Sequence, residues 1–393
     1  MRSARGAETG SVSPARLTAF RTLLRVERDE AFAAPLLASE RLADLSAEDR
    51  RLAHELTLGV LRWRGELDYL INVTADRPAE KLNLPVRIAL WLGLYQLRHL
   101  ERIPEHAAVS ESVELIKHGV HRRAAPLVNA ALRAAVRDRP AAPDERVRDP
   151  LNRLSIEASH PRWMLERWVG QFGDDETAAL ARANNVQAPT ALRINPLRAP
   201  SRARALEALS DEGVTVRNST VAPDALVVTG GHLSQSSHLL RDGWAYVQDE
   251  ASQLVAHLLG ARPGEAVLDL CAAPGSKTTL VAAAMDNRGT IVAVDRHRAR
   301  LATLAELCAR LGVRIALPLA ADASHDLPID PHKTFDRVLV DAPCSGTGTL
   351  RRNPEIKWRL AAGDIERFAT LQRALLREAA ARVRPGGRLV YST

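Results

Sequence analysis

The chain has 393 residues, 46% of them hydrophobic, and a formal net charge of +7 at pH 7. This apolar fraction supplies full globular cores and excludes a largely disordered protein, and the length indicates two or three domains. Arginine carries most of the positive charge, because the only lysines are Lys81, Lys117, Lys277, Lys333 and Lys357. Arginine suits phosphate binding and favours a nucleic-acid partner, although a GC-rich genome would produce the same bias.

The cysteine pattern and the hydropathy exclude several other classes of protein. Cys271, Cys308 and Cys344 have no paired or C-x-x-C spacing, so neither a disulfide framework nor a metal site is expected. The segment Met1–Thr18 lacks the apolar core of a signal peptide, and no stretch approaches the roughly 18 apolar residues that span a bilayer. We therefore expect a cytoplasmic protein with no membrane partner, and a monomer.

Residues 1–140 show only helical patterns. Ser13-Pro14 is typical of a helix start, and Ser46–Asp49 reads as a capping box. Apolar residues then recur every three or four positions, at Leu52, Leu56, Val60, Trp63, Leu67 and Leu70. Leu84–Leu97 is apolar almost all round, as the central helix of a bundle would be. The sequence therefore predicts an all-α first domain.

Residues 141–247 begin with a linker rich in proline and charge, which runs through Asp149-Pro150. A helix is then expected over Ser201–Ser210. Short strands are expected at Thr190–Asn195, Val214–Val216, Leu226–Val228 and Trp244–Val247. This pattern predicts a small α/β domain with an RRM-like fold.

From residue 248 to residue 393 strands and helices alternate. The expected strands are Ala266–Leu270, Thr290–Val294, Ile315–Leu319, Arg337–Val340 and Arg388–Tyr391. The expected helices are Ser276–Met285, Arg298–Leu311 and Asp364–Val383. Short apolar runs of this kind are typical of parallel strands buried on both faces. We therefore predict a doubly wound, Rossmann-like α/β domain that binds its ligand beyond the carboxyl ends of the strands.

The turn between the first strand and the first helix of this domain is a candidate cofactor loop. It consists of Cys271, Ala272, Ala273, Pro274, Gly275, Ser276 and Lys277. Small residues let a ligand approach the backbone, and the N-terminus of a helix presents free N–H groups. The loop lacks the glycines of a Walker A or G-x-G-x-x-G motif, which argues against an NTPase or a dinucleotide dehydrogenase. The alternative is a tight turn that binds nothing.

Three carboxylates follow the next strands in order. Asp295 ends the second strand, where an acid commonly accepts hydrogen bonds from ribose hydroxyls. Asp322 follows the third strand and is placed to meet an adenine amino group, and Asp341 ends the fourth. A single acid at such a position usually caps a helix, but three that open on one crevice predict a nucleoside-type cofactor.

The segment Asp341–Gly348 is the most specific motif in the chain. It places Cys344 in a glycine-rich loop at the carboxyl end of a strand, beside the expected cofactor and a carboxylate, where a thiol can take part in chemistry. Cys271 lies within the strand turn and Cys308 on an apolar helix face, so both are expected to serve packing.

Three segments resemble the signature motifs of the RNA cytosine-C5 methyltransferases of the NOL1/NOP2/Sun type: Asp269–Thr278, Asp341–Gly348 and Arg351–Trp358. The helical region resembles the RNA-binding NusB-type domain, and His160–Trp163 and Leu192–Asn195 resemble the middle region of the bacterial RsmB (Sun/Fmu) branch. The resemblance implies S-adenosylmethionine as cofactor and small-subunit ribosomal RNA as substrate.

The resemblance also implies the roles of individual residues. In the family a thiolate adds to C6 of the cytosine, C5 then takes the methyl group, and loss of the C5 proton expels the enzyme. Asp341 would stabilise this adduct near N3, and Cys344 would assist release. The nucleophile lies in a later Thr-Cys motif, after the Tyr391-Ser392-Thr393 end of the chain, so the 393-residue chain is expected to be inactive.

The resemblance and the charge also point to residues that contact RNA. The RNA backbone near the target base would be contacted by Arg351, Arg352 and Lys357. The target base itself must leave its stack to reach the site. Further phosphate contacts are expected in the helical domain, at Arg62, Arg64, Arg122, Arg123, Arg133 and Arg137. Each of these side chains, taken singly, is as easily a solvated surface charge.

Two alternatives remain open at this point. The chain could be a non-catalytic RNA-binding factor of the antitermination type that keeps the fold for RNA or cofactor contact. Alternatively, Cys344 could itself be the nucleophile, as in DNA cytosine methyltransferases, which would make the chain competent as it stands.

Overall fold

The computed structural model describes residues 12–39, 44–117, 120–231, 233–234 and 237–393, so residues 1–11 of the segment Met1–Thr18 lie outside it. These residues form two compact units, and each unit consists of two stretches of chain. Unit 1 comprises residues 1–187 and 346–362, and unit 2 comprises residues 188–345 and 363–393. This division differs from the boundaries expected after residues 140 and 247.

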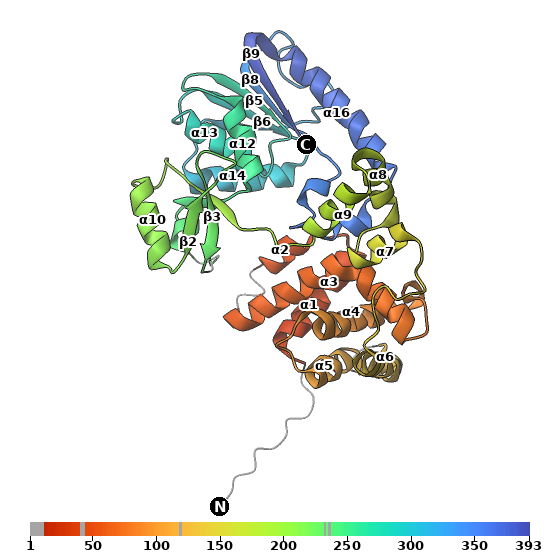
Figure 1. The fold of residues 1–393 in the computed structure, drawn as a ribbon. Coiled ribbons are helices and arrows are strands. Elements are labelled where there is room, and N and C mark those ends of the chain that lie inside the picture. The colour runs from red at the N-terminus through yellow and green to blue at the C-terminus, as the bar shows by residue number, and fades with distance from the viewer. Residues whose placement is uncertain (1–11, 40–43, 118–119, 232, 235–236) are drawn as a thin grey trace, which may run out of the picture. The chain divides into compact units, whose positions relative to one another are not determined.

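The first part of unit 1 is helical, as predicted (Figure 1). Its helices are α1 (Pro14–Arg28), α2 (Ala33–Leu37), α3 (Ala47–Thr74), η2 (Ala79–Lys81), α4 (Leu84–His99), α5 (Glu105–Lys117), η3 (Arg122–Ala124) and α6 (Ala125–Asp138). Pro14 stands in the first turn of α1, and the Ser46 hydroxyl caps α3 by accepting a hydrogen bond from the Asp49 N–H at 3.0 Å.

Helix α4 is the centre of this helical core. It contacts α1, α3, α5 and α6, which explains why it is apolar almost all round. A Cβ atom at Gly59 of α3 would lie 2.0 Å from Cζ of Tyr95 on α4. The two helices can therefore pack this closely only with glycine at that position.

Three more helices of unit 1 follow the predicted linker, in a stretch for which no element was predicted. They are α7 (Pro150–Glu157), α8 (Arg162–Phe172) and α9 (Asp174–Ala183). Asp149 caps α7 by accepting from the Asn152 N–H at 2.7 Å. Their apolar side chains surround Met164, Leu165 and Trp168, and Leu350 of the second stretch of unit 1 completes this small core.

Unit 2 begins with a four-stranded antiparallel sheet in the order β2-β3-β1-β4. Its strands are β1 (Ala191–Ile194), β2 (Thr215–Asn218), β3 (Ala225–Gly230) and β4 (Ala245–Val247), and its helices are α10 (Arg202–Asp211) and α11 (His238–Arg241). Leu192 and Ile194 of β1 pack with Leu209 of α10 and Leu239 of α11. The small α/β domain predicted here is therefore present, with one face of its sheet covered by its own helices.

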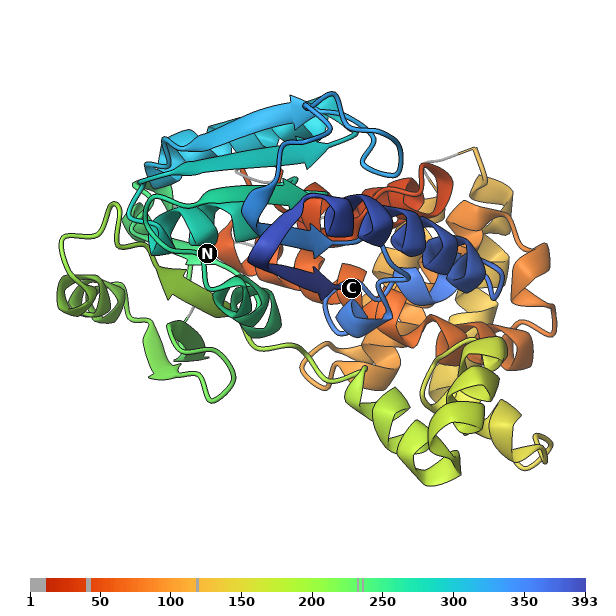
Figure 2. The same cartoon turned by 90° about the horizontal axis from the view of Figure 1, so that it is seen from above.

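The rest of unit 2 is a five-stranded parallel sheet in the order β7-β6-β5-β8-β9 (Figure 2). Its strands are β5 (Ala266–Leu270), β6 (Thr290–Asp295), β7 (Ala316–Ala320), β8 (Phe335–Asp341) and β9 (Val383–Ser392). All five predicted strands are present, and the last begins earlier than predicted. The first strand, β5, lies in the middle, so the strand order reverses between β5 and β8, which is where ligands of such sheets bind.

Helices cover both faces of the parallel sheet, as predicted. They are α12 (Glu250–Leu259), α13 (Ser276–Ala284), α14 (Arg298–Leu311) and α16 (Asp364–Ala381). Helices α12, α13 and α14 pack against Val267, Ile291 and Leu339, whereas α16 packs against the opposite face, beside β8 and β9. Helix α12 was not predicted. None of the helices in the described residues is long and apolar enough to span a membrane.

Candidate active site

The predicted cofactor loop joins β5 to α13. Cys271 and Gly275 have φ angles of +64° and +104°, and the Ala272 N–H donates to the Val294 carbonyl of β6 at 2.8 Å. A Cβ atom at Gly275 would lie 2.9 Å from Cγ of Leu304 on α14, so both the backbone angle and the packing require glycine. Gly275 is the N-cap of α13, and the N-terminal N–H groups of this helix lie beside the loop.

The two carboxylates predicted to hold the nucleoside lie at the ends of β6 and β7. Asp295 is the last residue of β6, is 5% exposed, and accepts a hydrogen bond from the His297 N–H at 2.8 Å. Asp322 follows β7 and accepts from the Ser324 N–H at 3.0 Å and the Ser324 hydroxyl at 2.6 Å. These hydrogen bonds hold the pKa of Asp322 below its ordinary value, so it is ionised at neutral pH.

Asp341 connects the cofactor loop to the end of β8. Its Oδ2 lies 2.6 Å from Nζ of Lys277, and its Oδ1 accepts from the Ser392 hydroxyl at 2.7 Å. The structure therefore brings together two of the predicted site residues, one from each motif. The ion pair holds the Asp341 carboxylate at the carboxyl end of β8, adjacent to the Pro-Cys loop.

The loop that carries Cys344 is held by β9 and α16. The Ala342 N–H donates to the Ser392 carbonyl at 2.9 Å, and Nε2 of Gln372 donates to the Pro343 carbonyl at 2.9 Å. The Tyr391 hydroxyl fixes Gln372 by donating to its Oε1 at 3.1 Å. Cys344 itself is half-buried, so its thiol is partly open to a reactant.

The other two cysteines have thiols that resist ionisation. Burial raises the pKa of Cys271 to about 12, and the neighbouring carboxylates add to this shift. Burial alone raises the pKa of Cys308 to about 11. Cys308 is 7% exposed within the core between the sheet, α13 and α14, as its apolar helix face predicted. Neither thiol is suited to act as a thiolate near neutral pH.

Asp269 is a buried acid of this region that the sequence analysis did not single out. It lies on β5, is 2% exposed, and its Oδ2 accepts from the Thr278 hydroxyl at 2.7 Å. Burial raises its pKa from 3.8 to about 7, and the nearby Asp341 adds to this effect. An acid inside an otherwise apolar strand was the signal that could have identified it.

The expected RNA contacts at Arg351, Arg352 and Lys357 lie in the second stretch of unit 1. Arg351 donates to the carbonyls of Val186 at 3.1 Å and Gln187 at 3.0 Å, and Arg352 is half-buried. Lys357 is fully buried. The expectation for Lys357 is therefore wrong for this structure, because a buried ammonium group cannot reach a phosphate.

The Lys357 amine instead serves as an internal donor. It donates to the carbonyls of Arg62 at 2.9 Å and Ser159 at 2.8 Å, and to Oδ1 of Asn185 at 3.0 Å. Burial and the nearby Arg62 hold the pKa of Lys357 well below its ordinary value. All three donor positions of the ammonium group are thus used within unit 1.

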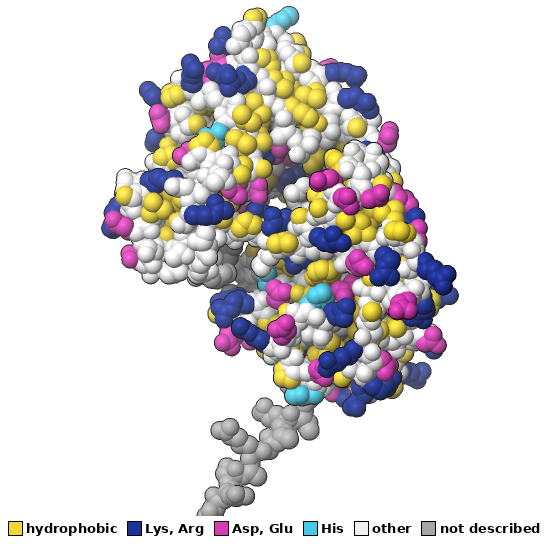
Figure 3. Space-filling view, in the orientation of Figure 1, with side chains coloured by type: hydrophobic (Ala, Val, Ile, Leu, Met, Phe, Trp, Pro, Cys, Tyr) yellow, Lys and Arg dark blue, Asp and Glu magenta, His cyan; other side chains and the backbone are white. Residues whose placement is uncertain are grey.

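The arginines of the helical domain divide into two groups. Arg62 is 7% exposed and donates to the Arg351 carbonyl, so the phosphate contact expected for it is also wrong. Arg64 is half-buried and pairs with Glu27 at 3.0 Å, and the contact expected for it stays a prediction. The remaining candidates have exposed side chains, namely Arg122, Arg123, Arg133 and Arg137. Figure 3 shows basic and acidic side chains interspersed over the face drawn there, without a continuous basic stripe among the described residues of that face.

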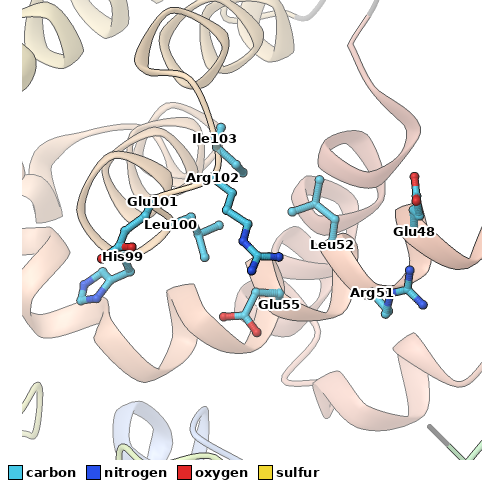
Figure 4. Close-up of a pocket in the computed structure, with 9 residues that line it drawn as sticks. All are labelled: Glu48, Arg51, Leu52, Glu55, His99, Leu100, Glu101, Arg102 and Ile103. Atoms are coloured by element: carbon cyan, nitrogen blue, oxygen red, sulfur yellow. The ribbon is translucent and has the colours of Figure 1, made fainter. Parts of the chain in front are cut away.

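A pocket of about 600 Å³ lies elsewhere, between the first half of α3 and the connection that follows α4 (Figure 4). The residues that line it are Glu48, Arg51, Leu52, Glu55, His99, Leu100, Glu101, Arg102 and Ile103. Acidic and basic side chains alternate around it, so it shows no preference for an anion. None of the predicted site residues lines this pocket.

The fold and the site together define a class of protein. A parallel sheet in this order, with a cofactor loop after the central strand and carboxylates after the next strands, is the arrangement of an S-adenosylmethionine-dependent methyltransferase. The residues present fit this cofactor, because a glycine-lined helix N-terminus adjoins Asp295, which is suited to the ribose hydroxyls.

Comparisons with known proteins identify the family. A family model described as 16S rRNA methyltransferase RsmB/F matches residues 256–393. A NusB family model matches residues 13–137, and a model of the RsmF/B-like ferredoxin-like domain matches residues 160–233.

Relatives match over most of the chain. The probable ribosomal RNA small subunit methyltransferase B of Bacillus subtilis (strain 168) is 36% identical over 95% of this chain and 83% of its own length. The ribosomal RNA small subunit methyltransferase B of Pseudomonas syringae pv. tomato is 37% identical over 90% of this chain and 77% of its own length. The chain belongs to the RsmB/F family of S-adenosylmethionine-dependent methyltransferases.

Solved structures agree with this assignment. The crystal structure of PH0851 superposes with a TM-score of 0.83 at 29% identity, over 97% of this chain and 86% of that one. A methyltransferase homolog protein from Pyrococcus horikoshii has a TM-score of 0.55 at 28% identity, over 62% of this chain and 76% of that one.

Proposed function

We propose that this protein transfers a methyl group from S-adenosylmethionine to C5 of a cytosine in small-subunit ribosomal RNA. The substrate class follows from the names of its relatives, which are small-subunit ribosomal RNA methyltransferases. The motifs around Asp341 and Cys344 support C5 as the methylated atom, because they resemble those of the cytosine-C5 enzymes.

The reaction needs a nucleophile because C5 of cytosine is too electron-poor to attack the sulfonium methyl group unaided. A thiolate forms a bond to C6, and the displaced electron pair makes C5 nucleophilic. C5 then bonds to the methyl group while the cofactor leaves as S-adenosylhomocysteine. A base removes the C5 proton, and the electron pair of that bond expels the thiolate from C6.

The residues of this chain divide these tasks. Asp295, Asp322 and the loop Cys271–Lys277 bind the cofactor. Asp341 stabilises the adduct by hydrogen bonding near N3 of the base, and Cys344 assists release. The nucleophile is the cysteine of a later Thr-Cys segment, so the polypeptide that ends at Thr393 forms no adduct.

One observation carries this proposal. The 2.6 Å pair between Lys277 and Asp341 joins the cofactor loop to the loop that bears Cys344. The residues assigned to the donor and to the base therefore lie at the same end of neighbouring strands β5 and β8, as a transfer between the two requires.

The test is a denaturing gel that detects covalent complexes between enzyme and labelled RNA in the presence of cofactor. It compares the 393-residue chain, a chain extended through the expected Thr-Cys segment, and Cys344→Ala in both. We expect no covalent band from the shorter chain. In the extended chain, Cys344→Ala should accumulate the adduct, because release is impaired.

Other results would favour the alternatives. A covalent band or 5-methylcytosine formed by the 393-residue chain, and lost on Cys344→Ala, would make Cys344 the nucleophile. RNA binding without methyl transfer by the extended chain would favour the antitermination-type factor.

A further inference from the structure

Strand β1 of the small sheet presents different side chains to its two faces. Leu192 and Ile194 pack into the core formed with α10 and α11. Arg193, and Asn195 directly after the end of β1, alternate with them and so point to the opposite face. There they meet residues of α13 and α14, the helices that follow the first two strands of the parallel sheet.

Arg193 is a buried cation without a carboxylate partner among the described residues. It is 1% exposed, and its Nε donates to Oε1 of Gln248 at 2.8 Å and its Nη2 to Oγ1 of Thr279 at 3.0 Å. Its guanidinium carbon lies 5.4 Å from the ring centre of Tyr246, the residue opposite Arg193 on β4. Burial lowers the pKa of Arg193 to about 10, so it remains charged at neutral pH.

A buried charge held only by neutral partners is costly, because each partner must be correctly aligned to replace water. Nη1 of Arg193 has no hydrogen-bond partner among the described residues. The two bonds that exist therefore carry most of the stabilisation of this charge. An apolar side chain of similar length would fill the same space without this cost, so simple packing does not explain an arginine here.

Thr279 connects Arg193 to the cofactor loop through hydrogen bonds. Its hydroxyl accepts from Arg193 and donates to the Gly275 carbonyl at 2.8 Å. Thr279 is 1% exposed, so water does not compete for this hydroxyl. Gly275 is the N-cap of α13 and the point where the loop turns into the helix. Arg193 thus orients the hydroxyl that adds a second hydrogen bond to the Gly275 carbonyl, which also accepts from the Thr279 N–H at 2.9 Å.

Asn195 provides a natural comparison. Its Nδ2 donates to the carbonyls of Gly243 and Leu311, both at 2.9 Å. Leu311 is the last residue of α14, far along the chain from the cofactor loop. Asn195 fastens the same strand to the same domain, and none of its hydrogen bonds reaches the loop.

We propose that Arg193 is a positioning residue for S-adenosylmethionine, which orders the cofactor loop through Thr279 and the Gly275 carbonyl. The small sheet then sets the geometry of the cofactor site as well as extending the protein surface. This inference rests on the cofactor assignment made above.

The test is calorimetric titration of the 393-residue chain with S-adenosylmethionine, combined with thermal unfolding of each variant. Arg193→Met and Thr279→Val should each weaken binding about tenfold, which corresponds to about 1.4 kcal/mol. The double variant should bind no more weakly than either single variant, because both remove the same connection. Arg193→Lys should recover only part of the affinity, since lysine lacks the planar fork.

Two controls separate positioning from general stability. Asn195→Ala should lower the unfolding temperature without weakening the binding of S-adenosylmethionine. Thr279→Ser keeps the hydroxyl and should bind S-adenosylmethionine with unchanged affinity. Asp295→Ala, which removes an expected direct contact, gives the reference for a lost ligand.

The outcomes are distinguishable. Unchanged affinity in folded Arg193→Met, or an equal loss of affinity in Asn195→Ala, would overturn the positioning role alone. If the unsubstituted chain does not bind S-adenosylmethionine, the cofactor assignment fails and this inference with it. Thr279→Val carries the test if Arg193→Met does not fold.

Discussion

At the scale of single residues, three ionisable side chains are buried without an oppositely charged hydrogen-bond partner among the described residues. Asp269, Arg193 and Lys357 are each at most 2% exposed, and none of them pairs with an opposite charge in the hydrogen bonds described above. Sequence reasoning found the acids at strand ends because chain order alone places them at one edge of the sheet. It missed the role of Arg193 because its partners, Gln248 and Thr279, lie 55 and 86 positions away.

Asp269 leads to a prediction about stability and pH. Its pKa is about 7 in the folded protein and 3.8 when exposed, so the folded state disfavours the ionised form. The stability linked to the neutral carboxyl is complete below pH 3.8 and is lost as the pH rises towards 7. Asp269→Asn keeps an oxygen for Thr278 and does not titrate.

The measurement is the unfolding temperature of both proteins from pH 4 to pH 8. The unfolding temperature of the variant should rise relative to that of the unsubstituted chain as the pH increases to about 7. Above that pH the difference between the two unfolding temperatures should level off. A difference that is independent of pH would mean that Asp269 does not titrate in this range. Groups that do not interact with Asp269 titrate alike in both proteins and cancel in the difference.

At the scale of elements, the parallel strands were predictable because each is a short apolar run bounded by turn residues. Helices α7 to α9 were not predicted, because no element was assigned to the stretch that follows the expected linker. That linker was expected to run through Asp149-Pro150. In the structure these same residues form a helix start, with Asp149 as the cap. Lys357 was assigned to RNA contact because it stands beside Arg351 and Arg352 in a charged motif, and the sequence does not show that this one side chain is buried.

The burial of Lys357 leads to a second prediction. Lys357→Met removes a buried donor that bonds the carbonyls of Arg62 and Ser159 and Oδ1 of Asn185. We expect a loss of about 2–4 kcal/mol of unfolding free energy, measured by denaturant titration. RNA affinity of the folded variant should not change, because the amine is not exposed.

Lys333 offers a matched control for this substitution, because it is an exposed lysine. Lys333→Met should change stability by no more than about 0.5 kcal/mol. Weaker RNA binding by folded Lys357→Met would restore the original expectation that Lys357 contacts RNA.

At the scale of the whole molecule, the net positive charge of the chain is consistent with a family that acts on RNA. Arg62 is buried and Arg64 is half-buried in an ion pair with Glu27, so the exposed pair Arg122 and Arg123 is the better candidate for phosphate contact in the helical domain. In the 393-residue chain, Arg122→Gln combined with Arg123→Gln should reduce the slope of log affinity against log salt by about 1.4–1.8, from about 0.7–0.9 per lost phosphate contact.

Removing the same charge elsewhere tests whether this effect is local. Arg25 and Arg28 are exposed at the end of α1, and replacing both with glutamine should leave the salt slope nearly unchanged. Equal slopes for the two double variants would mean that overall charge, and not a contact at η3, drives binding.

The interleaving of the two units has a consequence for the order in which the protein is made. A ribosome completes α3 long before it adds Lys357 and Trp358, whose side chains donate to the carbonyls of Arg62 and Leu61. Unit 1 can therefore reach its final state only after residues 188–345 of unit 2 have already emerged. The segment 346–362 therefore docks onto helices of unit 1 that were synthesised long before it.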